Sequence, residues 1–216
     1  IPIIGGGLNQ IIGIEQTQNI RDNGFPGFYE YDKNFCLSSE CLSKKPFYPV
    51  YVKLFDPTVI SKDNTFYLFG TDLTGKLRLF FGNDLLSNNS FEEHPKSPIS
   101  YDLKNSRCAG PIFEYENKVY RISMDNSNSY GEAINIEEIV TLNKNDYLEK
   151  NLSSKIFHNT KFMNYVDRYH HLDVLDRNDN GSIILLVDGA KDKLIQMHGK
   201  LIKKQIRTDT NAWDVN

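Results

Sequence analysis

Six acidic residues stand where short apolar runs of this sequence begin or end, and carboxylates are the groups that glycosidic chemistry needs. They are Glu40, Asp56, Asp72, Asp125, Asp173 and Asp188. In that chemistry one carboxyl group is protonated and acts as the acid, while another is ionised and acts as base or nucleophile. Asp and Asn at strand ends also cap turns, so a structural role is the competing interpretation for each residue.

Three of these carboxylates are the catalytic candidates. Glu40 is the candidate general acid, Asp56 is the candidate base, and Asp125 is the third. The alternative for the first two is a turn glutamate and a strand-start aspartate that caps the following backbone.

Two arginines are candidate substrate-binding residues, because a guanidinium offers forked donors to a carboxylate, a phosphate or sugar hydroxyls. Arg121 interrupts the apolar run KVYRISMD, so we expect it to have a carboxylate partner, with Asp125 as one option. Arg107 could instead lie on a solvated loop.

Further binding candidates are Tyr130, which could stack on a sugar ring, and the pair His171 and Asp173 with Asp188. His170 and His171 are adjacent, and on a regular strand they face opposite ways. We expect His171 to be the inward one, where it could bond a sugar, orient an acid or ligate a central ion. A satisfied core histidine is the alternative. No Cys/His set has zinc-ligand spacing, so neither a metal site nor a cofactor is expected.

The elements that position these residues are predicted to be strands. Residues 65–72, 76–84, 118–125 and 182–189 are rich in β-branched and aromatic residues and are bounded by turn signals. Residues 134–142 favour a strand, followed by a short turn or helix at 145–149. The tail is basic and is predicted to form an edge strand pair around Gly199.

An internal repeat runs through the chain. A proline, a short apolar run, an acidic or Asn turn and a second apolar run recur at 25–40, 56–72 and 110–125, and again without the proline at 171–189. A period of roughly 40–60 residues suits a propeller blade of four strands. The fold class predicted is therefore all-β, as an incomplete five-bladed β-propeller with about four blade equivalents.

The repeat residues also carry a resemblance. Residues 106–149 contain Arg107 before AG, then YR, Asp125, YG, and EIVTL before DYLE, and residues 168–189 contain HHLD and a closing DG. These blocks resemble the propeller domain of glucosamine inositolphosphorylceramide transferases and their bacterial relatives, which is similar to family 43 glycoside hydrolases. Weaker matches extend the resemblance to about residues 25–189, with Glu40 and Asp56 at matching acidic positions.

The chain departs from that family in two places, because Asp56 follows Glu40 too soon for a full blade and no first blade is recognisable in 1–24. The resemblance implies a base, a pKa-modulating Asp and an acid Glu in hydrolases, and a separate transfer domain in transferases. We therefore expect a propeller that binds a carbohydrate or glycolipid head group without chemistry of its own. A hydrolase-like enzyme and a structural scaffold subunit are the alternatives.

The composition excludes several classes of protein. Hydrophobic residues make up 39% of 216 residues, too many for a disordered chain. The net charge of −3 argues against a nucleic-acid partner, and no run approaches the roughly 20 apolar residues of a transmembrane segment.

The predicted organisation is an extension at 1–24, a propeller-like domain at 25–190 and a basic tail at 191–216. Open strand edges predict a protein partner or an oligomer that completes the propeller. Sequons at Asn88, Asn151 and Asn180 weakly favour a secretory-pathway lumen or the extracellular space. Cys36 and Cys41 could form a disulfide, or all three cysteines could be reduced.

Overall fold

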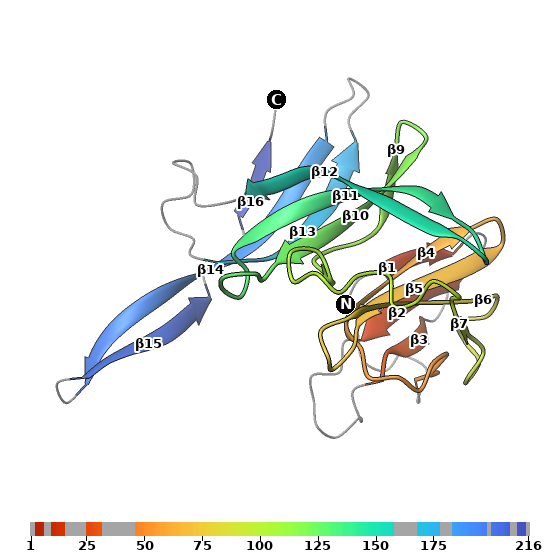
Figure 1. The fold of residues 1–216 in the computed structure, drawn as a ribbon, viewed down its shortest axis with the longest axis horizontal. Helices are drawn as coiled ribbons and strands as arrows, with labels where there is room; N and C mark the ends of the chain where they lie inside the picture. The colour runs from red at the N-terminus through yellow and green to blue at the C-terminus, as the bar shows by residue number, and fades with distance from the viewer. Residues whose placement is uncertain are drawn as a thin grey trace. The chain divides into compact units, whose positions relative to one another are not determined.

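The fold is all-β, as seen in a computed structural model that describes residues 3–6, 10–15, 25–31, 46–157, 168–177, 183–197, 200–207 and 211–214. No helix occurs in these residues. A helix long and apolar enough to cross a membrane is therefore also absent from this part of the chain. The described residues form two compact units (Figure 1). Unit 1 comprises residues up to 101 together with 141–147, and unit 2 comprises residues 102–140 together with those from 148 onward.

Unit 1 contains two antiparallel sheets. The first has the order β1-β2-β3, formed by Ile3–Gly6, Gln10–Glu15 and Gly27–Tyr31. The second has the order β4-β5-β6-β7, formed by Phe55–Lys62, Thr65–Thr71, Leu77–Gly82 and Glu92–Glu93. The four-stranded meander is the blade unit that the repeat predicts.

Unit 2 contains two more sheets. In one, β12, β11, β10 and β8 lie side by side and β9 also pairs with β10; these strands are Tyr147–Phe157, Ala133–Leu142, Lys118–Asp125, Arg107–Cys108 and Phe113–Tyr115. In the other, β13, β14 and β15 are neighbours and β16 also pairs with β14; they span Arg168–Arg177, Ile183–Met197, Lys200–Arg207 and Asn211–Asp214. Figure 1 shows β15 beside the C-terminal part of β14.

The repeat is visible in the turns of two hairpins, one in each unit. Asp63 and Asn64 connect β4 to β5, and Glu116 and Asn117 connect β9 to β10. All four residues have positive φ, between 48° and 61°. Two central residues with positive φ define the type I′ turn, whose twist matches that of the flanking strands. The two copies of the repeat therefore share one backbone turn.

Each unit has its own hydrophobic core. In unit 1 the core includes Phe28, Leu68 and Phe80. In unit 2 it includes Ile122, Met124, Ile134, Tyr169 and Leu172, which come from β10, β11 and β13. Burying a side chain such as Ile or Met contributes roughly 1.5–3 kcal/mol. Because strand residues alternate between faces, this core fixes the opposite face of β10 for Arg121, Ser123 and Asp125.

A bulge in β13 changes the strand register at the two histidines. The register with β14 shifts between Tyr169 and His171, and Tyr169 and Leu172 both pack into the core of unit 2. Residues three apart face opposite ways on a regular strand, so one extra residue is accommodated between them. We infer that His170 and His171 both lie on the side of β13 away from the core.

Most strand predictions are confirmed: residues 65–72, 76–84, 118–125 and 134–142 coincide with β5, β6, β10 and β11. The strand predicted at 182–189 continues to Met197 as β14, and the strand pair around Gly199 is confirmed as β14 and β15. Of the turn or helix predicted at 145–149, the turn is confirmed at residues 145 and 146, and the helix is wrong, because β12 begins at Tyr147. Cys108 is a buried free thiol, and Cys36 and Cys41 lie outside the described residues.

Candidate functional site

The second face of the β10–β11 pair carries polar side chains in register. Arg121 lies opposite Glu137, and Ser123 lies opposite Asn135. These four side chains are buried, as is Asp125 at the end of β10. Polar groups removed from water are costly unless they are hydrogen-bonded, so their partners define what the face can do.

Arg121 is fully buried, and its carboxylate partner is Glu149 of β12. The guanidinium donates from Nε to Glu149 Oε2 at 2.9 Å and from Nη2 to Oε1 at 2.7 Å. It also donates from Nη1 to the backbone oxygen of Asn105 at 3.0 Å. The expectation of a carboxylate partner is confirmed, although it is Glu149 instead of the Asp125 option. The bidentate pair attaches β12 to Arg121 of β10, and the hydrogen bond to Asn105 attaches the 102–105 segment.

Glu137 is also fully buried. Ser123 Oγ donates to its Oε1 at 3.0 Å, and Asn151 Nδ2 lies 3.2 Å from both carboxylate oxygens. Burial raises the pKa of Glu137 and the charge of Glu149 adds to this, against the opposing effects of Arg121, Ser123 and Asn151. The result is a carboxyl group with a strengthened tendency to hold a proton.

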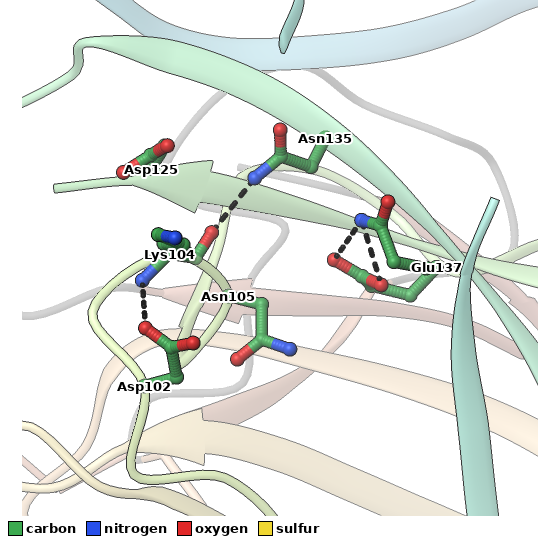
Figure 2. Close-up of a pocket in the computed structure, with 7 residues that line it drawn as sticks. Asp102, Lys104, Asn105, Asp125, Asn135 and Glu137 are labelled. Atoms are coloured by element: carbon green, nitrogen blue, oxygen red, sulfur yellow. Dashed lines mark hydrogen bonds between the residues drawn. The ribbon is translucent and has the colours of Figure 1, made fainter. Parts of the chain in front are cut away.

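These side chains border a pocket of about 260 Å³ within unit 2. Its wall consists entirely of polar residues, which are Asp102, Lys104, Asn105, Asp125, Asn135, Glu137 and Asn151. Figure 2 shows the 102–105 segment facing Asn135 and Glu137 across the pocket. Asn135 Nδ2 donates to the backbone oxygen of Lys104 at 2.8 Å, and Lys104 N–H donates to Asp102 Oδ1 at 3.0 Å. The pocket therefore offers carboxylates, amides and an ammonium from a segment held in place.

Asp125 joins the pocket to the loop that follows β10. Its Oδ1 accepts hydrogen bonds from Ser127 N–H at 2.9 Å and Ser127 Oγ–H at 2.6 Å. Within the described residues, the hydrogen bonds to this carboxylate all end on Oδ1. Asp125 Oδ2 can therefore accept a hydrogen bond from a ligand.

A second group in unit 2 combines cationic and aromatic side chains. The Arg107 guanidinium carbon lies 5.0 Å from the centroid of the Tyr130 ring. The rings of Tyr130 and His170 lie 6.2 Å apart at a tilt of 41°. Tyr130 is 36% exposed. Two predicted binding residues, Arg107 and Tyr130, are therefore in contact, and the histidine beside the Tyr130 ring is His170.

The remaining predicted site residues fall in different places. Asp56 lies in unit 1 at a bulge of β4, with a φ of 48° that is unusual for a non-glycine residue. His171 is opposite Asp188 in the β13–β14 pair, and both His171 and Asp173 are half-buried. Glu40 lies outside the described residues, so its role as an acid stays a prediction. In the part of the chain that the structure describes, no group of three His, Cys, Asp or Glu residues could hold a metal ion.

Sequence reasoning missed Glu137, Glu149 and the pocket amides Asn135 and Asn151. A signal for them existed, because Asn135 and Glu137 alternate with Ile134 and Ile136 in the run AINIEEIVTL. Polar residues at every second position of a strand mark one face of it. The contribution of the 102–105 segment had no such signal, since it depends on Arg121 and Asn135 reaching its backbone.

Known proteins resemble this chain in sequence. Residues 49–190 match the family model described as glucosamine inositolphosphorylceramide transferase 1, N-terminal. The transferase of that name from Arabidopsis thaliana is 30% identical over 173 residues, which is 73% of this chain and 21% of the relative. The one from Oryza sativa subsp. japonica is 28% identical over 149 residues, or 64% of this chain and 20% of the relative. The chain thus spans about a fifth of the length of these curated relatives.

Solved structures agree on the fold. A family 43 α-L-arabinofuranosidase from Clostridium thermocellum superimposes with a TM-score of 0.55 at 15% identity, covering 96% of this chain and 72% of the enzyme. The Bacteroides ovatus xyloglucan PUL protein GH43B gives a TM-score of 0.58 at 12% identity, covering 98% of this chain and 40% of that one. At these identities the likeness shows the fold alone, and it confirms the propeller class. The match over 49–190 settles the family: the chain belongs to the N-terminal family of glucosamine inositolphosphorylceramide transferase 1.

Proposed function

We propose that this domain binds the sugar or cyclitol of a glycan or glycolipid head group in the pocket of unit 2, without chemistry of its own. The observation that carries the proposal is the pocket, which is lined by polar residues and includes the buried Asp125, whose Oδ2 accepts no hydrogen bond from the described residues. Sugars present several hydroxyl groups, each of which donates and accepts hydrogen bonds. Carboxylates and amides fixed by other hydrogen bonds are suited to such a ligand, because little rotamer freedom remains to be lost on binding.

The family supports the same class of ligand. The relatives are named glucosamine inositolphosphorylceramide transferase. That name includes a sugar, glucosamine, and a cyclitol, inositol. This domain matches the N-terminal part of that family. It would therefore act beside the transfer chemistry, by holding or orienting a head group.

The test is isothermal titration with myo-inositol, D-glucosamine and methyl β-D-glucoside, using wild-type protein and Asp125→Asn. The substitution keeps the size of the side chain and an oxygen for Ser127, but removes the charge from the pocket wall. A hydrogen bond to a charged group is worth about 1.5–3 kcal/mol, so we expect affinity to fall at least about tenfold. Asp72→Asn is the matched control, because Asp72 makes the same type of turn in unit 1. If none of the probes binds the wild-type protein, the proposal fails and a scaffold role is favoured.

Hydrolysis is the second candidate, and the specific observation in its favour is Glu137. A glycosidase needs one protonated carboxyl group, and burial raises the pKa of Glu137 beside the pocket. Release of nitrophenol from a panel of nitrophenyl glycosides, lost in Glu137→Gln, would support this candidate. A wild-type protein that binds the sugars but leaves the whole panel intact would exclude hydrolysis of those bonds and favour the binding role.

A further inference from the structure

The basic tail forms a two-stranded hairpin with the end of β14. The ladder of β14 with β13 ends at Ala190, and its ladder with β16 covers residues 184–187. Beyond Ala190, β15 is the strand that pairs with β14 in the described part of the chain (Figure 1). Residues 191–197 and 200–207 are called the basic hairpin below.

Positive charge is concentrated in the basic hairpin. It has six basic residues and one acidic residue, whereas the whole chain has a net charge of −3. The basic residues are Lys191, Lys193, Lys200, Lys203, Lys204 and Arg207, and the acidic one is Asp192. A local excess of one charge attracts partners of the opposite charge, so the hairpin suits an anionic partner that the rest of the chain does not.

The register of β14 with β15 divides these residues between two faces. Directly opposed residues of an antiparallel pair share a face, and successive pairs alternate between the faces. One face contains the pairs Lys191–Ile206, Lys193–Lys204, Ile195–Ile202 and Met197–Lys200. This cationic face therefore combines four lysines with four apolar residues, and none of the residues at these positions is acidic. Asp192 is opposite Gln205 and belongs to the other face.

Two lysines of the cationic face oppose each other directly, because Lys193 is paired with Lys204. Like charges at opposed positions destabilise a strand pair. An anion bound at this position would remove the repulsion. Lysines on a strand also discourage pairing with the edges of other chains, but that role does not require two of them to be opposed.

The apolar residues of the cationic face indicate the class of the anionic partner. The pair Ile195–Ile202 lies between Lys193–Lys204 and the last pair of the ladder, Met197–Lys200. Binding at a membrane interface combines burial of apolar residues with attraction of lysines to anionic lipids. Proteins that bind single-stranded nucleic acid stack bases on aromatic rings, and no residue at the positions of this face is aromatic. The composition of the face thus favours a lipid surface.

We propose that the cationic face of the basic hairpin binds the surface of a membrane that contains anionic lipids. The lysines of the face attract the lipid phosphates, and its isoleucines and methionine enter the interface between them. This contact is independent of the carbohydrate pocket, because it uses β14 and β15, which do not line the pocket. It gives the domain a second binding surface of a different chemical class.

The test is sedimentation of the whole chain with vesicles of phosphatidylcholine alone and of phosphatidylcholine with phosphatidylserine. With the two lipids at about four to one and about 0.1 M salt, we expect at least about tenfold tighter binding to the anionic vesicles. The preference should decrease at about 0.5 M salt, because the screening length becomes shorter.

The variant that tests the cationic face combines Lys193→Gln with Lys204→Gln. A lysine near an anionic surface strengthens binding about fivefold, so the double variant should bind the anionic vesicles roughly twentyfold more weakly. Lys193→Arg with Lys204→Arg keeps both charges and should bind as the wild type does. Lys53→Gln with Lys144→Gln makes the same change of net charge in unit 1, and it should also leave binding unchanged.

Several results would overturn the proposal. One is equal binding, or no binding, of the wild-type protein to the two kinds of vesicle. Another is unchanged binding by Lys193→Gln with Lys204→Gln, or an equal loss in the unit 1 variant. Tighter binding to a single-stranded RNA through the same two lysines would assign the face to a nucleic acid instead. Because these vesicles contain neither sugar nor cyclitol, every one of these results leaves the proposed function standing.

Discussion

The turn at Asp72 in unit 1 and the turn at Asp125 in unit 2 are built in the same way and are used differently. Asp72 Oδ1 accepts from Thr74 N–H at 2.8 Å and from Thr74 Oγ–H at 2.6 Å. Asp125 Oδ1 accepts from Ser127 N–H at 2.9 Å and from Ser127 Oγ–H at 2.6 Å. Both aspartates come at the end of the second strand of a type I′ hairpin, which makes these turns equivalent points of the repeat.

The difference lies in the neighbouring strand, where the residue opposite the position two before the aspartate is Arg78 in unit 1 and Asn135 in unit 2. In unit 1, Arg78 donates to Asp72 Oδ2 at 3.1 Å and also pairs with Glu93. Both oxygens of the Asp72 carboxylate therefore accept hydrogen bonds within unit 1. In unit 2, Asn135 donates to the backbone oxygen of Lys104 instead, and Asp125 lines the pocket. A repeated turn can thus be purely structural in one copy and line a pocket in another, depending on whether the neighbouring strand supplies an arginine to the aspartate.

The largest expected effect comes from removing Arg121, and Arg78 in unit 1 is the comparison. Arg121→Met deletes a fully buried cation and leaves Glu149 and Glu137 without it, which should reduce the free energy of unfolding by about 3–5 kcal/mol. Arg78→Met removes a cation whose side chain is 23% exposed, and we expect at most about 1 kcal/mol. Urea denaturation of both variants measures the difference, and equal losses would contradict the contrast between the two units.

Two glycines provide a second comparison. Gly131 and Gly75 both have positive φ, but a Cβ on Gly75 meets nothing within 4 Å whereas one on Gly131 would lie 2.6 Å from Tyr169 O. Gly75→Ala should cost about 1–2 kcal/mol for the backbone conformation alone. Gly131→Ala should cost more, and it should also shift the NMR signals of Tyr130 and His170. A Gly131→Ala protein as stable as Gly75→Ala would show that the loop is not fixed by β13.

Two buried carboxylates should affect stability with opposite pH dependence. Burial raises the pKa of Asp72, but hydrogen bonds from Thr74, Lys76 and Arg78 outweigh it and lower the pKa to about 2. This stabilisation, about 2 kcal/mol, is present above pH 3.8 and is lost as the pH falls toward 2. The raised pKa of Glu137 has the reverse effect: its contribution is complete below pH 4.5 and is lost as the pH rises through the folded-state pKa.

Urea denaturation of Asp72→Asn and Glu137→Gln between pH 2 and pH 7 tests these signs. The advantage of wild type over Asp72→Asn should grow between pH 2 and pH 4. Its advantage over Glu137→Gln should shrink above pH 4.5. The same sign for both variants would show that the pKa of Glu137 is lowered, as that of Asp72 is, and a difference from Glu137→Gln that does not change with pH would show that it is not shifted.

The smallest effect is expected in the two type I′ turns. Glu116 has a φ of 48°, a conformation that Asn and Gly adopt more readily than Glu. Glu116→Asn should therefore raise the melting temperature slightly, by a stabilisation of roughly 0.5 kcal/mol. Asp63→Asn is the matched control in unit 1 and should be close to neutral, because Asp already tolerates this region. A loss of stability in Glu116→Asn would indicate that Glu116 makes a contact that outweighs its backbone cost.

The sequence carried enough information for the strands and the repeat, since β10 alternates apolar and polar residues and the DN and EN turns each supply two positive φ values. It also indicated Arg121 as a residue that needs a carboxylate. It could not identify Glu149 as that carboxylate, because the pairing of β12 with β11 brings together residues 28 positions apart. The orientation of His170 depended on a bulge, and a bulge changes the strand period without a mark in the amino-acid pattern.

The central claim, that the pocket of unit 2 is where a sugar binds, is tested most directly by NMR. Backbone amide shifts of the whole chain would be followed while myo-inositol 1-phosphate is added. The account predicts that shifts concentrate at 102–105, 125–131, 135–137 and 151, and that Asp125→Asn weakens them whereas Asp72→Asn leaves them in place. Shifts concentrated in unit 1, or spread evenly over both units, would contradict it.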